Sequence, residues 1–376
     1  MIHKDIRNGQ DILSADEDYA DLSEYFLIHD FKRIFLVCAP YIVKLPLYRK
    51  IKSMEENGRI FITSYQDFTP NPADTDAERG RELFEHSPHD LLMAIGGGSS
   101  IDVAKYIRCS FPEIPFLAVP TTAGTGSEST GFAVIYHNDE KQSLSNPACL
   151  PSAVLFDPSS LLSLPVYQKA STMMDALCHA MESCWCVNSN EESLSLSREA
   201  MRKIFAHKDG YLLNRPEDNA GMLQAANLAG HAINLTKTTA GHAMCYHLTK
   251  LYGLPHGHAA ALCVNVVFPY MLAHPEKISD PRGLPALERA YDIIAEEFGV
   301  SSPDEAASAF SRILGSLSLG SPDRAQIGDN DIALLTGTVN PERLQNHPLK
   351  FSEEDFACLY KQLLFGSGNT NHENSD

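Results

Sequence analysis

The pattern of hydrophobic and polar residues divides the chain into two regions. Up to about residue 157, short apolar runs alternate with amphipathic stretches, whereas beyond residue 166 nearly every segment has the residue spacing of a helix. Strands that alternate with helices are typical of a parallel sheet covered by helices. We therefore expect an α/β domain over residues 1–160, an all-helical domain over 161–365 and a polar, frayed tail over 366–376.

The individual elements follow from the same pattern. The first region is predicted to contain the strands 33–38, 59–65, 91–95, 116–119, 131–137 and 153–157 and the helices 41–57, 75–86 and 101–108. The second region is predicted to contain the helices 167–187, 191–207, 218–235, 239–252, 258–273, 284–298, 303–316, 329–335 and 353–364. The Asp157-Pro158 turn marks the boundary, because no strand pattern follows it.

A run of small residues follows the predicted strand 91–95 directly. Gly96, Gly97, Gly98 and Ser99 precede a helix whose first backbone amides would point at any group above the glycines. Such a helix start binds anions, and a dinucleotide pyrophosphate is a suitable one. The run lacks the GxGxxG pattern of the common dinucleotide fold, so a tight turn without a ligand is the alternative interpretation.

A loop rich in hydroxyl groups follows the next predicted strand, 116–119. It reads TTAGTGS, and the side chains of Thr121, Thr122 and Thr125 are able to hydrogen-bond a phosphate or a ribose. The loop therefore supplies further candidate residues for a nucleotide cofactor.

Histidines are concentrated in one apolar segment of the helical region. Residues 236–261 contain His242, His247, His256 and His258. Upstream, Asp175 and His179 are four residues apart and share one face of a predicted helix. If these groups converge, nitrogen and oxygen ligands without a thiolate suit iron(II), zinc, cobalt or manganese. A core histidine paired with a carboxylate is the alternative interpretation, and His247 and His258 are expected to support or pack around the site.

Charge and cysteine content exclude several classes of function. The formal net charge of −18 opposes binding to nucleic acid or to anionic membranes. Neither a signal-peptide core nor an apolar run of membrane-spanning length is present, so we expect a soluble, cytoplasmic protein. The nine cysteines form no CxxC pair and are expected to be buried thiols in a reducing compartment.

Four motifs together resemble the iron-containing alcohol dehydrogenase family. They are GGGSSIDVAK at 96–105, PTTAGTGSE at 120–128, DALCHAME at 175–182, and a histidine fourteen residues before the histidine of PHG. The resemblance extends from about Pro70 to Pro348. It implies a dehydroquinate synthase-like fold, with an α/β dinucleotide-binding domain, an all-α domain, and a cleft that holds nicotinamide against a metal.

The resemblance also assigns cofactors and site residues. It implies Fe(2+), with Zn(2+) or another divalent metal as the alternative, and either NADPH or NADH. The implied metal ligands are Asp175, His179, His242 and His256. The residues assigned to the nicotinamide cofactor are Gly96, Gly97, Gly98, Ser99, Asp102, Thr121, Thr122, Thr125 and Lys141.

The chain departs from the family at two positions. Many relatives have a proton-relaying histidine four residues after the third ligand, where this chain has Tyr246, a phenol that still can donate a proton. Many relatives end the first strand with an aspartate that holds the ribose 2′-hydroxyl, where this chain has Ala39. Without that carboxylate nothing repels a 2′-phosphate, which favours NADPH.

Within the family, the run NLTKTTAGHAMCYHLTKLYG is most similar to phosphonoacetaldehyde reductases. It places Lys237 and Lys250 near the metal ligands in sequence, and a phosphonate needs such cations on so acidic a protein. We therefore expect reduction of phosphonoacetaldehyde to 2-hydroxyethylphosphonate, with Lys237 and Tyr246 at the reaction site. The alternatives are a reductase of lactaldehyde or butyraldehyde type, a dehydroquinate synthase-like lyase, and a scaffold without turnover.

Two further expectations concern the rest of the chain. The segment TVNPERLQNHP, 338–348, resembles a C-terminal signature of the family and is expected to be structural rather than catalytic. The expected partner is a small aldehyde or alcohol, and a homodimer is compatible with the sequence.

Overall fold

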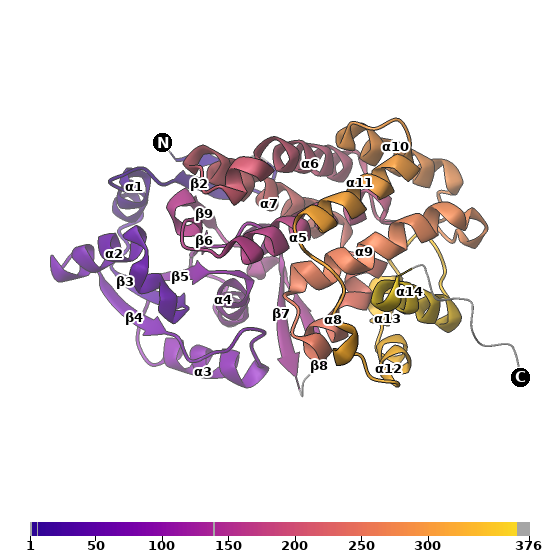
Figure 1. The fold of residues 1–376 in the computed structure, drawn as a ribbon. Helices are drawn as coiled ribbons and strands as arrows, with labels where there is room; N and C mark the ends of the chain where they lie inside the picture. Colours follow the sequence, from indigo (N-terminus) through magenta and orange to yellow (C-terminus); the bar gives the residue numbers. More distant parts are fainter. Residues whose placement is uncertain (1, 6, 138–139, 367–376) are drawn as a thin grey trace, which may run out of the picture. The chain divides into compact units, whose positions relative to one another are not determined.

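The computed structural model describes residues 2–5, 7–137 and 140–366, which fold as two compact units (Figure 1). Unit 1 comprises Met1–Pro165 and His207–Asn234, and unit 2 comprises Val166–Ala206 and the chain from Leu235 onward. The domain boundaries expected from the sequence stay a prediction. Apart from Gly366, the expected C-terminal tail lies outside the described residues.

The elements of the first 165 residues alternate between strands and helices. They are β1 (His3–Lys4), β2 (Asp11–Ser14), α1 (Ala20–Ile28), β3 (Arg33–Cys38), η1 (Pro40–Lys44), α2 (Pro46–Glu56), β4 (Phe61–Tyr65), α3 (Asp74–Glu85), β5 (Leu91–Gly96), α4 (Gly98–Ser110), β6 (Phe116–Pro120), η2 (Ser127–Ser129), β7 (Phe132–His137), β8 (Glu140–Ser145), η3 (Pro147–Cys149), β9 (Ala153–Phe156) and η4 (Pro158–Leu161).

The remaining chain is helical throughout its described part. Its elements are α5 (Val166–Trp185), α6 (Glu191–Leu212), α7 (Pro216–Thr236), α8 (Ala240–Tyr252), α9 (His256–Ala273), η5 (Pro275–Lys277), α10 (Leu284–Phe298), α11 (Pro303–Ser316), η6 (Arg324–Gln326), α12 (Asp331–Gly337), α13 (Pro341–Leu344) and α14 (Glu353–Phe365). The α/β class with a helical C-terminal region, expected from the sequence, is therefore confirmed.

The main sheet of unit 1 has the strand order β1-β2-β9-β6-β5-β3-β4. All its pairings are parallel except that of β1 with β2. After β3 the chain adds β4 on one side and then crosses to place β5 on the other. Ligands of such sheets bind where the order reverses, beyond the carboxyl ends of the strands. That position lies between β3 and β5, next to Gly96, Gly97 and Gly98 at the carboxyl end of β5.

Each face of this sheet is covered by helices. Because successive side chains alternate between faces, Ile34 and Leu36 of β3 pack with α1 and α2, while Phe35 and Val37 pack with α3 and α4 (Figure 1). Each fully buried side chain of this size contributes about 1.5–3 kcal/mol of hydrophobic free energy. This packing holds the strand ends, and therefore the loops that follow them, in fixed positions.

Two local patterns differ from the sequence-based expectation. The helix expected over 41–57 is broken, because Leu45 is extended before Pro46, which begins α2. The strand expected over 131–137 is present as β7, but it pairs antiparallel with β8 in a separate two-stranded sheet. The polar sequence of β8 gave no strand signal.

No helix in the described part of the chain combines the length and apolar character that crossing a bilayer requires. The nine cysteines are free thiols, and Cys358 is the exposed one among them.

Candidate metal centre

Three helices of unit 2 supply the residues of the predicted metal site. Asp175 and His179 are one turn apart on α5, His242 lies in the first turn of α8, and His256 begins α9. A Cβ atom at Gly257 would lie 2.1 Å from the carbonyl oxygen of Ser171. Only glycine therefore lets the start of α9 approach α5 closely enough to bring His256 to Asp175.

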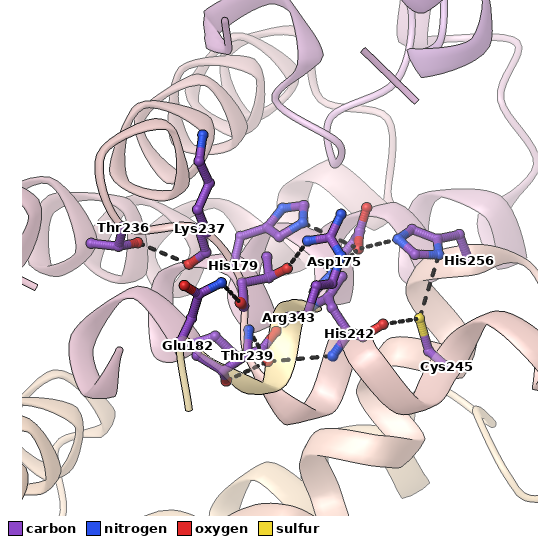
Figure 2. A network of polar contacts seen from close by, with 12 residues as sticks. Asp175, His179, Glu182, Thr236, Lys237, Thr239, His242, Cys245, His256 and Arg343 are labelled. Atoms are coloured by element: carbon purple, nitrogen blue, oxygen red, sulfur yellow. Dashed lines mark hydrogen bonds and ion pairs between the residues drawn. The ribbon is translucent and has the colours of Figure 1, made fainter. Parts of the chain in front are cut away.

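The carboxylate of Asp175 stands at the centre of the cluster (Figure 2). Its Oδ1 atom is 3.3 Å from Nε2 of His242, 3.8 Å from Nε2 of His179 and 3.9 Å from Nε2 of His256. One ligand atom from each of Asp175, His242 and His256 lies within 4.8 Å of the others. His179 adjoins this group, and its ring stacks on that of His242 with 4.6 Å between the ring centres.

The chemistry of this donor set fits a divalent transition metal. Asp175, His179 and His242 are almost fully buried, and His256 is about one third exposed. Among the described residues, Nδ1 of His179 has no hydrogen-bond partner although it is buried. Three imidazoles around one carboxylate offer nitrogen and oxygen ligands, a combination that binds both iron(II) and zinc.

The protonation states also suit a metal. Burial alone would raise the pKa of Asp175, but His179, His256 and His242 together lower it. Burial lowers the pKa of His179 to about 4. An ionised carboxylate and a neutral imidazole are the forms that bind metal, so these two groups need lose no proton at neutral pH.

Glu182, whose role the sequence does not reveal, contacts and orients His242. Its carboxylate contacts Nδ1 of His242 and accepts hydrogen bonds from the backbone amide (3.0 Å) and hydroxyl (2.7 Å) of Thr239. Despite complete burial, the charge of His242 and these hydrogen bonds lower the pKa of Glu182 to about 2. A carboxylate behind a ligand histidine fixes the tautomer that directs Nε2 at the metal. Its position in the motif, one helical turn after His179 and two after Asp175, was the available signal.

The other two histidines of the segment lie outside the cluster. His258 contacts the hydroxyl of Tyr167 through Nδ1 and the carbonyl of Gly320 through Nε2, each at 2.9 Å. His247 is half-buried on α8, and burial lowers its pKa. Both placements agree with packing rather than ligand roles.

Tyr246 lies beside the histidine cluster, whereas the side chain of Lys237 points away from it. The ring of Tyr246 lies parallel to that of His256, with 6.0 Å between their centres, and its hydroxyl is buried. Lys237 precedes α8 with a positive φ of 72°. Its side chain extends away from the histidine cluster in Figure 2. Burial first, and the charge of Arg343 second, lower its pKa.

The residues predicted for the cofactor lie in unit 1. A Cβ atom at Gly98 would lie 3.0 Å from the Thr125 methyl group, and one at Gly97 would lie 3.4 Å from Thr122. The glycine turn and the threonine loop are thus in contact. Thr121 shares a 2.7 Å hydrogen bond with Tyr41, which lies in η1 just after Ala39. The ends of β3, β5 and β6 therefore meet at one place.

Asp102 supports the threonine loop from α4. It accepts hydrogen bonds from the hydroxyl of Ser127 at 2.6 Å and from the amide of Val134 at 3.1 Å. Ser99 is partly exposed in the first turn of α4. Lys141 belongs to β8, but its side chain lies outside the described part of the structure.

Known proteins match the chain along most of its length. The family model "Iron-containing alcohol dehydrogenase" matches residues 10–158, and that of the C-terminal part of Fe-containing alcohol dehydrogenases matches residues 169–364. "Alcohol dehydrogenase 4" of Schizosaccharomyces pombe is 30% identical over 70% of this chain and 66% of its own length. "Phosphonoacetaldehyde reductase" of Streptomyces viridochromogenes is 31% identical over 69% of this chain and 74% of its own length.

Solved structures share the fold at lower identity. A 1,3-propanediol oxidoreductase has a TM-score of 0.82 and 24% identity, covering 94% of this chain and 97% of its own. A sulfoacetaldehyde reductase of Bifidobacterium kashiwanohense, solved with NAD+, has a TM-score of 0.82 and 22% identity, covering 95% and 97%. The dehydroquinate synthase-like fold is thereby confirmed. With both family models matched, the chain belongs to the iron-containing alcohol dehydrogenases, oxidoreductases for which iron and a nicotinamide dinucleotide are the supported cofactors.

Proposed function

We propose that the protein is a metal-dependent aldehyde reductase that uses NADPH or NADH. The observation that carries the proposal is the buried cluster of Asp175, His242 and His256, with His179 beside it. When bound there, a divalent metal polarises the carbonyl of the aldehyde, while the reduced nicotinamide supplies a hydride. The products are a primary alcohol and the oxidised cofactor, and one proton is consumed.

Each side chain of the cluster has a separate proposed role. Asp175, His179, His242 and His256 hold the metal, and Glu182 keeps His242 oriented. Tyr246 is the proposed source of the proton that the product oxygen needs, because its ring lies beside His256. Its hydroxyl is a weaker acid than an imidazolium, so exchange with water must restore the proton between turnovers.

The cofactor is proposed to bind at the shared edge of β3, β5 and β6. Gly96, Gly97 and Gly98 carry no side chain that would cover the first backbone amides of α4, where the pyrophosphate is proposed to bind. Further contacts to the cofactor are proposed for Ser99, Asp102, Thr121, Thr122, Thr125 and Lys141. The small side chain of Ala39 leaves the end of β3 without a charge that would repel a 2′-phosphate. This favours NADPH.

We further propose phosphonoacetaldehyde as the substrate and 2-hydroxyethylphosphonate as the product. The relative named phosphonoacetaldehyde reductase supports this assignment, as does the cation Lys237 in the TKTT run before α8. Relatives named for 1-propanol and 1,3-propanediol support the alternative of a short neutral aldehyde. Nine free cysteines fit a reducing compartment, and we propose the cytoplasm as the place of action.

The test compares two aldehydes with the iron-loaded protein and NADPH. We expect a higher kcat/KM for phosphonoacetaldehyde than for propionaldehyde, with 2-hydroxyethylphosphonate identified by phosphorus NMR. A preference for propionaldehyde would reject the phosphonate and keep the reductase. Absence of NADPH oxidation with either aldehyde would reject the reductase itself.

A further inference from the structure

Arg343 lies beside the metal cluster without an anionic partner among the described residues. Its guanidinium donates to the hydroxyl of Thr238, and its central carbon lies 5.5 Å from the centre of the Tyr246 ring. Neither contact carries a negative charge. A half-buried guanidinium often pairs with a carboxylate or a phosphate, whereas Arg343 makes no direct ion pair with any described residue.

The backbone that carries Arg343 is fastened to the helix that carries His242. The amide of Asn340 donates to the carbonyl of Ala243 in α8 at 3.2 Å, and the side chain of Asn340 accepts from the amide of Arg343 at 3.0 Å. On the other side of α13, Asn346 donates to the carbonyl of Thr238 at 3.3 Å. Arg343 is therefore held at a fixed place relative to the cluster, which reduces the entropy lost when it binds a ligand.

Three observations place the guanidinium close to the metal ligands. The ring of Tyr246 contacts both partners, lying 6.0 Å from the ring of His256 and 5.5 Å from the guanidinium carbon. The hydroxyl that Arg343 contacts belongs to Thr238, and the next residue, Thr239, is hydrogen-bonded to the carboxylate of Glu182 behind His242. In Figure 2 the side chain of Arg343 points towards the labelled histidines.

A second cation adds to the positive potential. Burial first, and then Arg343, lower the pKa of Lys237, so the two charges act on one another. Lys237 also has a φ of 72°, a strained conformation for a residue with a side chain and one that clusters at functional sites. An anionic ligand at Arg343 would therefore be attracted by both charges, by Arg343 directly and by Lys237 from farther away.

We propose that Arg343 binds the anionic group of a substrate whose carbonyl lies at the metal centre, with Lys237 as a second, more distant cation. This proposal rests on the proposed aldehyde reductase function and names its substrate class, short aldehydes with a phosphonate, sulfonate or carboxylate group. The planar guanidinium forms paired hydrogen bonds with such groups. The segment 338–348 thus has a substrate-binding role in addition to its structural one.

The kinetic test uses Arg343→Gln, Arg343→Lys and the control Arg324→Gln. Arg324 is also an arginine over an aromatic ring, 5.2 Å from the centre of Phe365, but on another part of unit 2. For Arg343→Gln we expect kcat/KM for phosphonoacetaldehyde and sulfoacetaldehyde to fall at least about tenfold, the scale of a charge-assisted hydrogen bond. The loss for propionaldehyde, which has no anionic group, should be several-fold smaller than that for the two charged aldehydes. Arg343→Lys should restore part of the loss, and Lys237→Ala should cause a smaller one.

The outcomes separate this proposal from the function on which it rests. Equal losses for charged and neutral aldehydes in Arg343→Gln would show that Arg343 only packs α13 against Tyr246. A wild-type protein that reduces none of the aldehydes would reject the reductase. In that case binding of methylphosphonate to the iron-loaded protein, measured by calorimetry, still tests the anion site.

The calorimetric measurement compares the affinity of three proteins for methylphosphonate. Wild type and Arg324→Gln should bind methylphosphonate with equal affinity, and Arg343→Gln should bind it at least about tenfold more weakly. Equal affinity in all three proteins would overturn the anion site whatever the kinetics show.

Discussion

The proposed metal centre and the glycine turn would bind their ligands with different groups, side chains in the first case and backbone amides in the second. The metal centre consists of side chains from α5, α8 and α9, buried and oriented by hydrogen bonds such as that between Glu182 and Thr239. The glycine turn offers backbone amides at the start of α4, and its side chains are hydrogen atoms. The first site depends on which residues are present, and the second depends on which side chains are absent.

This difference decides how each site should respond to substitution. Removal of a proposed ligand or of its support should weaken metal binding and leave cofactor binding unchanged. Adding atoms to the glycine turn blocks the cofactor while leaving the metal intact. Each of the following predictions tests one side of that separation.

Loss of the carboxylate behind His242 should have the largest effect. For Glu182→Gln we expect metal affinity to fall about 10–100-fold, because the amide no longer fixes His242 by an ionic hydrogen bond. Affinity is measured by competition with a chelator, and NADPH affinity should stay unchanged. Glu288→Gln, an exposed position on α10, is the matched control. Wild-type metal affinity in Glu182→Gln would show that His242 is oriented without it.

Filling the glycine turn should act on the other site. For Gly97→Leu we expect NADPH to bind about tenfold more weakly, because a side chain beside Thr122 obstructs backbone approach by the pyrophosphate. Fluorescence titration measures the affinity, and metal content should match wild type. Gly315→Leu, where a Cβ meets nothing within 4 Å, is the control. Unchanged NADPH affinity would mean that the turn binds no cofactor.

A charge at the end of β3 should change cofactor preference. For Ala39→Asp we expect the ratio of kcat/KM with NADPH to that with NADH to fall about tenfold, equivalent to about 1.4 kcal/mol. The added carboxylate repels a 2′-phosphate and accepts a hydrogen bond from a 2′-hydroxyl. If the ratio stays constant, the ribose lies elsewhere.

Two buried histidines should make the free energy of unfolding depend on pH, with a smaller effect than the changes above. Burial lowers the pKa of both His179 and His231 to about 4 from the ordinary value of 6.5. Below pH 6.5 the unfolded chain therefore binds protons that the folded chain does not, so stability falls as pH drops towards 4. For each histidine the loss between pH 7 and 5.5 is about 1 kcal/mol.

Urea unfolding of the metal-free protein across this pH range measures the effect. Replacement of either histidine by glutamine should make the pH dependence shallower, and His86→Gln, at an exposed position, should leave it as in wild type. Only His179→Gln should also lower metal content. The ring of His231 contacts the side chain of Asn8 at 3.0 Å and belongs to unit 1, so a lowered metal content in His231→Gln would contradict the location of the metal site in unit 2.

The sequence contained most of the fold but only part of the site. Strands such as β3 and helices such as α10 agree with their apolar patterns almost to the residue. β2, with four residues, and β8, with a polar sequence, gave too little signal. The cluster of Asp175, His242 and His256 could be predicted from the sequence because histidine is rare in apolar segments.

The remaining contributors could not be predicted because their roles depend on tertiary packing. Glu182 has a role only because α8 lies against α5, and Arg343 only because α13 is fastened to Ala243 about a hundred residues earlier in the chain. Both stand in motifs of the sequence, DALCHAME and TVNPERLQNHP, but a motif does not show which residues their side chains contact in the folded chain. Gly257, in contrast, stands within a motif, but the need for it appears only when α9 meets α5.

The most direct measurement is the metal content of iron-loaded wild type, His256→Ala and His247→Ala, determined together with NADPH-dependent aldehyde reduction. Both histidines belong to the same segment, but only His256 reaches Asp175. We expect one metal ion per chain in wild type and His247→Ala, and loss of most metal and activity in His256→Ala. Full metal and normal activity in His256→Ala would contradict the metal centre.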